Sequence, residues 1–123
     1  MKEPSAELII DIDVIRNNII YLKSLLNPNS KFMAVLKANA YGHGLQKIAD
    51  GINDIVDGFG LVRIEEALNV RKFSSKKILL MQGLYNKEDL DLAIKNLPQE
   101  MKNYKSINKI EEEVLTWIQD LKN

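Results

Sequence analysis

The sequence predicts an α/β domain built around a parallel sheet. Three short apolar runs, at residues 32–36, 59–62 and 78–81, alternate with segments in which apolar residues recur every three or four positions. Because parallel strands are joined by helical crossovers, this alternation is typical of consecutive βα units. The chain has 123 residues, 46% of them hydrophobic, which suits one small domain with a globular core.

Helices are expected where the apolar spacing is helical and where polar residues cap or break the segment. The first helix follows a short strand at residues 7–11 and is capped by Asp11 or Asp13, and Asn86 caps the fourth. The expected helices cover about residues 14–26, 44–56, 64–73, 87–94 and 106–121.

The pattern changes after Leu97. Residues 98–105 are polar and show no strand pattern. The last expected helix carries an apolar stripe that includes Val114, Trp117 and Leu121. Two interpretations of this stripe remain open, since it could pack on the exposed sheet as ordinary core or pair with another copy of the chain.

Composition excludes several classes of protein. Lys plus Arg and Asp plus Glu are each 17, so there is no basic excess to attract nucleic acid or an anionic membrane. The absence of cysteine excludes a disulfide scaffold and a thiolate metal site. No apolar run suits a signal peptide or a bilayer span, so we expect a soluble, cytoplasmic protein.

The candidate site lies at the end of the first apolar run. Residues 32–36 read as a strand buried on both faces, and they lead directly into Lys37 and a Gly-rich loop with Tyr41 and the only histidine, His43. Ligands of βα proteins bind at the carboxyl ends of strands. Either the Lys37 ammonium reaches water, or partial desolvation makes its amine a nucleophile that forms a Schiff base.

Residues 37–44 read Lys-Ala-Asn-Ala-Tyr-Gly-His-Gly and, preceded by Ala34-Val35, resemble the pyridoxal-phosphate lysine motif of the alanine racemase family. The resemblance extends over about residues 6–97. It implies that Lys37 holds pyridoxal 5'-phosphate as an internal aldimine and acts as catalytic acid/base, and that Tyr41 donates a hydrogen bond to the phosphate. We expect His43 to fix the loop by a hydrogen bond, and we expect no metal site because other ligands at suitable spacing are lacking.

The resemblance also implies the fold. It points to the N-terminal part of a pyridoxal-phosphate-binding (β/α)8 TIM barrel, truncated after about three βα units and followed by a C-terminal amphipathic helix, since a whole barrel takes about 250 residues. Residues 1–97 are then a partial alanine racemase-type barrel and residues 98–123 a divergent helical tail. The alternative is a small open doubly wound sheet whose last helix covers one face.

The implied reaction is the interconversion of L- and D-alanine, an isomerase activity in which the substrate is a small amino acid and the protein a homodimer. In the family the second acid/base group is a tyrosine from the partner subunit's C-terminal domain, and an arginine from a later strand faces the pyridine nitrogen. Neither has a matching position here. We therefore expect little or no turnover from this chain alone. The alternative is a truncated, non-catalytic remnant that binds the cofactor weakly or serves only as an oligomerising domain.

Overall fold

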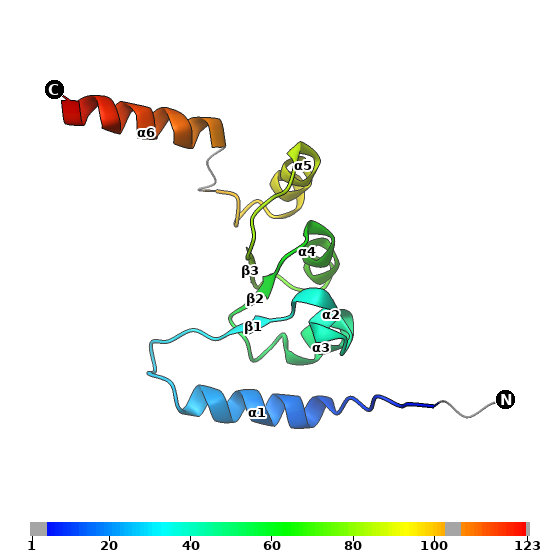
Figure 1. The fold of residues 1–123 in the computed structure, drawn as a ribbon. Coiled ribbons are helices and arrows are strands. Elements are labelled where there is room, and N and C mark those ends of the chain that lie inside the picture. Colours follow the sequence, from blue (N-terminus) through cyan, green and yellow to red (C-terminus); the bar gives the residue numbers. More distant parts are fainter. Residues whose placement is uncertain (1–4, 103–106, 123) are drawn as a thin grey trace.

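The computed structural model describes residues 5–102 and 107–122. Its sheet has three parallel strands in the order β1-β2-β3, and Figure 1 shows strand and helix alternating along the chain. The strands are β1 (Met33–Val35), β2 (Gly58–Leu61) and β3 (Lys77–Leu80), and the helices are α1 (Ile12–Ser24), α2 (Lys37–Tyr41), α3 (Leu45–Ile52), α4 (Ile64–Arg71), α5 (Lys87–Asn96) and α6 (Ile107–Lys122). The predicted α/β class and parallel sheet are confirmed.

Two helix starts lie where the sequence places a cap. The Asp11 carboxylate accepts the Val14 N–H at 3.2 Å at the start of α1, and the Asn86 side chain accepts the Asp89 N–H at 2.8 Å at the start of α5. Each side chain satisfies a donor that the first helical turn leaves without an intrahelical partner. The predicted caps are therefore confirmed.

The prediction of a strand at residues 7–11 is wrong. These residues form no ladder, and Leu8 and Ile9 are exposed. They extend from the start of α1, away from the sheet (Figure 1). An isolated extended segment has no neighbour to take its backbone hydrogen bonds, so its apolar composition alone cannot make it a strand.

The second predicted helix is shorter than expected: α3 ends at Ile52 and not near residue 56. Arg16 of α1 donates to the Gly51 carbonyl at 2.8 Å and forms an ion pair with Asp54. These contacts tie α1 to the end of α3. The hydrogen bond from Arg16 also lowers the pKa of Asp54.

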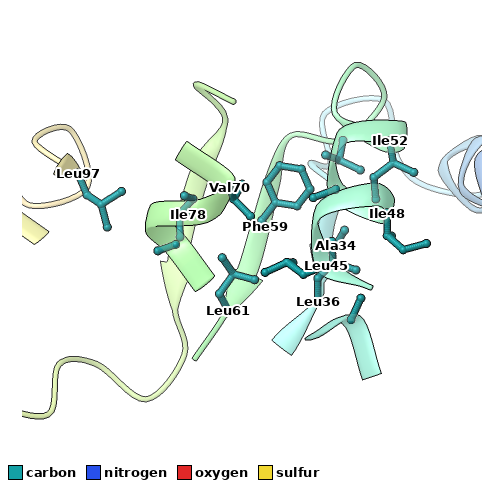
Figure 2. Close-up of a cluster of buried hydrophobic side chains, with 14 of the residues drawn as sticks. Ala34, Leu36, Leu45, Ile48, Ile52, Phe59, Leu61, Val70, Ile78 and Leu97 are labelled. Atoms are coloured by element: carbon teal, nitrogen blue, oxygen red, sulfur yellow. The ribbon is translucent and has the colours of Figure 1, made fainter. Parts of the chain in front are cut away.

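The core lies between the sheet and the helices on one side of it. Phe59 of β2 is fully buried, with Ala34 of β1 and Ile78 of β3 in the same row of the sheet. Figure 2 shows these side chains together with Ile52 of α3 and Val70 of α4. Helices α2 to α5 lie on one side of the strands (Figure 1), which is the layering of a barrel segment and not of a doubly wound sheet.

The other face of the sheet is open, so the prediction that residues 32–36 are buried on both faces is wrong. Met33 and Val35 are exposed, whereas Ala34 and Leu36 are buried. Leu79, which lies level with Val35 across Gly60, is exposed as well. Apolar composition predicts a strand, but burial on both faces also needs a second layer, and the described residues supply only one.

The polar segment after α5 closes the outer edge of the sheet without forming a strand. The Glu100 carboxylate accepts the Ile78 N–H at 3.3 Å and pairs with Arg71 of α4. Residues 98–102 show no strand, as the sequence predicts, and residues 103–105 lie outside the described part of the chain. Among the described helices, none is long and apolar enough to cross a membrane.

Asp57 joins the turn before β2 to the residue before β1. Its carboxylate accepts the Phe32 N–H at 2.7 Å, and its own N–H donates to the Phe32 carbonyl at 2.9 Å. The bond from Phe32 lowers the pKa of Asp57. Positive charge on Lys23, Lys31 and Lys76 lowers it further.

Replacing Asp57 by Asn should remove a pH-dependent part of the stability. The folded pKa lies below the unfolded value of about 3.9, so the ionised carboxylate stabilises the fold above that value. This stabilisation is lost as the pH falls through the lowered folded pKa. In urea unfolding at pH 7 and pH 3, the free energy of unfolding should change less in Asp57→Asn than in the parent chain. Asp91→Asn, at an exposed position of α5, is the control; an equal pH effect in all three proteins would contradict the assignment.

Candidate functional site

Lys37 lies directly after the carboxyl end of β1. The Leu36 N–H donates to the Gly60 carbonyl at 2.9 Å, so the pairing of β1 with β2 continues to the residue before Lys37. Exposed and buried residues alternate along β1, with Val35 on the open face, and the half-buried Lys37 continues that series. The predicted position of Lys37 at the carboxyl end of a strand is confirmed.

The segment that follows is a left-handed turn. Ala38, Asn39, Ala40 and Tyr41 have φ values of 53°, 55°, 55° and 56°. The left-handed conformation costs L-residues roughly 1–2 kcal/mol each, because Cβ approaches the following carbonyl. Four such residues in succession mark a strained segment that its surroundings must hold in place.

Hydrogen bonds from both ends hold this turn. The Ala40 N–H donates to the Leu36 carbonyl at 2.9 Å, and His43 Nδ1 lies 2.9 Å from the Ala40 carbonyl, to which it donates. Asn39 Oδ1 accepts the Leu45 N–H at 2.8 Å and so caps α3, whose preceding residue, Gly44, has no capping side chain. The expectation that His43 fixes the loop after Lys37 is confirmed.

Tyr41 ends the turn, four residues after Lys37, and its side chain is exposed. The turn therefore presents a primary amine and a phenol at the same edge of the sheet. An amine is a nucleophile towards carbonyl carbon, and a phenolic hydroxyl donates to anions. The His43 side chain is bonded to the Ala40 carbonyl and the Asn39 side chain to the Leu45 N–H, so both hold the backbone that carries Lys37 and Tyr41.

A cavity of about 500 Å³ lies away from these residues. It opens at the amino end of the sheet, where Lys31, Met33, Asp57 and Lys77 are among its lining residues. Lys37 and Tyr41 lie at the carboxyl end. The described chain thus supplies residues for a site at that edge, with an open sheet face below them.

Arg63 is a cation at the same edge to which the sequence reasoning assigned no role. It follows β2 by two residues and is exposed, and its N–H donates to Glu66 Oε1 at 3.0 Å. Since the carboxyl ends of parallel strands share one edge, Arg63 and Lys37 both flank it. The sequence could have indicated this position, because Arg63 directly follows the apolar run at residues 59–62 and so stands at the carboxyl end of a predicted strand.

Comparison with known proteins identifies related sequences. Residues 10–117 match the family described as alanine racemase, N-terminal domain. The chain is 46% identical over 88 residues to the alanine racemase of Aliivibrio salmonicida, covering 71% of this chain and 24% of that protein. It is 45% identical over 83 residues to the Haemophilus influenzae alanine racemase, covering 66% and 23%.

Solved structures agree with this match. The biosynthetic alanine racemase from Pseudomonas aeruginosa superposes with a TM-score of 0.64 at 38% identity, covering 68% of this chain and 24% of that one. The alanine racemase of Clostridium difficile 630, in complex with cycloserine, gives a TM-score of 0.63 at 32% identity, covering 68% and 23%. The matched segment thus spans about a quarter of each of these relatives.

The left-handed conformation of the turn can be tested by replacing one of its residues with glycine and measuring the free energy of unfolding. Ala38 is exposed, so Ala38→Gly should relieve the left-handed strain without loss of packing, and should raise the free energy of unfolding by about 0.5–1 kcal/mol. Ala67→Gly in the right-handed helix α4 is the control and should lower it by about 1 kcal/mol or more. Denaturant unfolding measures the free energy of unfolding of both variants. A lower value in Ala38→Gly than in the parent chain would contradict the left-handed conformation at this position.

Proposed function

This chain belongs to the alanine racemase N-terminal domain family, and on that premise we propose that the Lys37 amine is the covalent attachment point for pyridoxal 5'-phosphate. In this proposal the Tyr41 hydroxyl donates a hydrogen bond to the cofactor phosphate. The observation that carries the proposal is the position of Lys37, directly after β1 and directly before a strained turn that ends in Tyr41. Backbone strain of this kind concentrates at functional sites.

The chemistry of the residues present fits this cofactor. Its aldehyde needs a primary amine that solvent can reach, and Lys37 is half-buried rather than enclosed. Its phosphate needs a donor, and the exposed Tyr41 can supply one. The bond of His43 to the Ala40 carbonyl and the bond of Asn39 to the Leu45 N–H fix the backbone that carries both groups.

When bound, pyridoxal phosphate acts as an electron sink that labilises the α-proton of an amino acid. Lys37 Nζ would then take up and return that proton on one face of the substrate. The proposed reaction is the interconversion of L- and D-alanine, which needs a second acid/base group on the opposite face. No residue of this sequence is assigned that role, so we expect this chain alone to bind the cofactor without measurable racemisation.

A second candidate function is an oligomerising domain without chemistry. The observation that favours it is the open apolar face of the sheet, on which Met33, Val35 and Leu79 are exposed. Large exposed apolar patches often mark surfaces that contact another molecule. Cofactor binding at Lys37 separates the two candidates.

Covalent attachment at Lys37 is tested by absorbance and mapping. The full chain, mixed with pyridoxal phosphate, should develop visible absorbance, and borohydride should fix the label on the peptide containing Lys37. Lys37→Arg keeps the positive charge but cannot condense with the aldehyde, so it should lose both signals. Lys47→Arg, at an exposed position of α3, is the control and should keep them. Labels scattered over several lysines in the parent chain would refute the proposal.

The phosphate contact predicts a specific defect in Tyr41→Phe. Loss of one hydrogen bond to a charged group costs about 1.5–3 kcal/mol, so the dissociation constant for pyridoxal phosphate should rise about tenfold or more. Binding of pyridoxal, which lacks the phosphate, should not change. Tyr21→Phe on α1 is the control. An equal loss of affinity for both aldehydes would contradict a phosphate contact.

A further inference from the structure

Asn39 occupies the middle of the left-handed turn between Lys37 and Tyr41. Its φ and ψ are 55° and 44°, a backbone conformation that asparagine tolerates better than most L-residues. Its carbonyl oxygen accepts the Gly42 N–H at 3.2 Å and the Gly44 N–H at 3.0 Å. The backbone of Asn39 therefore closes the turn that carries Tyr41.

The side chain of Asn39 ties the turn to the core. Its Oδ1 accepts the Leu45 N–H at 2.8 Å, and Leu45 is the buried first residue of α3. Because a backbone N–H can only donate, this bond also decides which side-chain atom of Asn39 is the oxygen. Ala38 and Ala40, the turn residues on either side, carry no polar side chain. Of these three residues, only Asn39 can hold the turn to α3 by its side chain.

Lys37 is held by a different contact. It directly follows the bond from the Leu36 N–H to the Gly60 carbonyl, which is 2.9 Å long and continues the pairing of β1 with β2. This pairing does not involve Asn39. Loss of the Asn39 side chain should therefore leave the Lys37 amine in place. The Tyr41 phenol, two residues after Asn39, should lose its fixed position.

We propose that Asn39 is a positioning residue that gives this site its preference for a phosphorylated aldehyde over the same aldehyde without phosphate. It acts through Tyr41, because its bond to α3 keeps the phenol within reach of the phosphate of a ligand attached at Lys37. This inference rests on the proposed function, which makes Lys37 the attachment point and Tyr41 the phosphate donor. It adds that two separately held parts of the chain recognise the aldehyde and the phosphate, the strand end and the turn.

The bond itself is tested without ligand, by hydrogen exchange of the Leu45 amide. In Asn39→Ala this amide should exchange about fivefold faster or more, because the N–H loses its acceptor. Asn39→Asp keeps an oxygen at the same place and should keep the protection. Asn69→Ala removes the same amide group from the α4 wall of the cleft that Asn39 also lines, outside the turn, and is the control. Equal exchange rates in all four proteins would overturn the proposal.

Ligand preference is measured as the ratio of the dissociation constants for pyridoxal and pyridoxal phosphate. In Asn39→Ala this ratio should fall about tenfold, to the value in Tyr41→Phe, while the constant for pyridoxal stays as in the parent chain. Borohydride should still fix the pyridoxal label on Lys37 alone. Asn39→Asp should keep the parent ratio in high salt, which screens the charge it adds, and so should Asn69→Ala. Labels scattered over several lysines in Asn39→Ala would overturn the separation of the two parts.

The double variant Asn39→Ala/Tyr41→Phe distinguishes positioning of Tyr41 from an independent effect. If Asn39 acts through Tyr41, the ratio in the double variant should equal that in Tyr41→Phe. An additive loss would overturn the proposal, as would a parent ratio in Asn39→Ala. Either result leaves the phosphate contact of Tyr41 standing, because Tyr41→Phe tests that contact alone. A parent chain without preference for the phosphate contradicts the contact, and this inference with it.

Discussion

The pairing of β1 with β2 is the contact on which the rest of the structure depends. It extends past β1 to the bond between Leu36 and Gly60, and so fixes the backbone up to Lys37. The pairing of β2 with β3 adds a close approach, since a Cβ on Gly58 would stand 2.8 Å from the Lys77 carbonyl oxygen. A side chain at that position would separate the two strands.

The left-handed turn gives the chain after this fixed strand end a defined backbone conformation. A flexible loop after Lys37 would leave the amine and the Tyr41 phenol free to separate, whereas four left-handed residues hold them one short turn apart. The conformation is unfavourable for each residue, and two bonds hold it: His43 bonds back to the Ala40 carbonyl, and Asn39 Oδ1 accepts the Leu45 N–H at the start of α3. Local strain is thus offset by capping of α3, which links the site to the core.

One face of the sheet is left uncovered by the described residues. The helices cover one side only, as in a segment of a barrel wall, and each of these relatives is about four times as long as the matched part. In a whole barrel such a face is filled by side chains of other strands. In the described residues this face is open, and Val35, which is exposed on it, lies two residues before Lys37.

The sequence by itself determined the strand and helix order, the caps at Asp11 and Asn86, and the place of Lys37 at a strand end, because these depend on local periodicity and on side chains within a few residues. Only the tertiary structure decided that residues 7–11 form no strand, that Arg16 ties α1 to the end of α3, and that the turn after Lys37 is left-handed. Alanine has no preference that signals a left-handed backbone, and burial on both faces depends on a second layer. Both are set by contacts distant in sequence, which local periodicity does not encode.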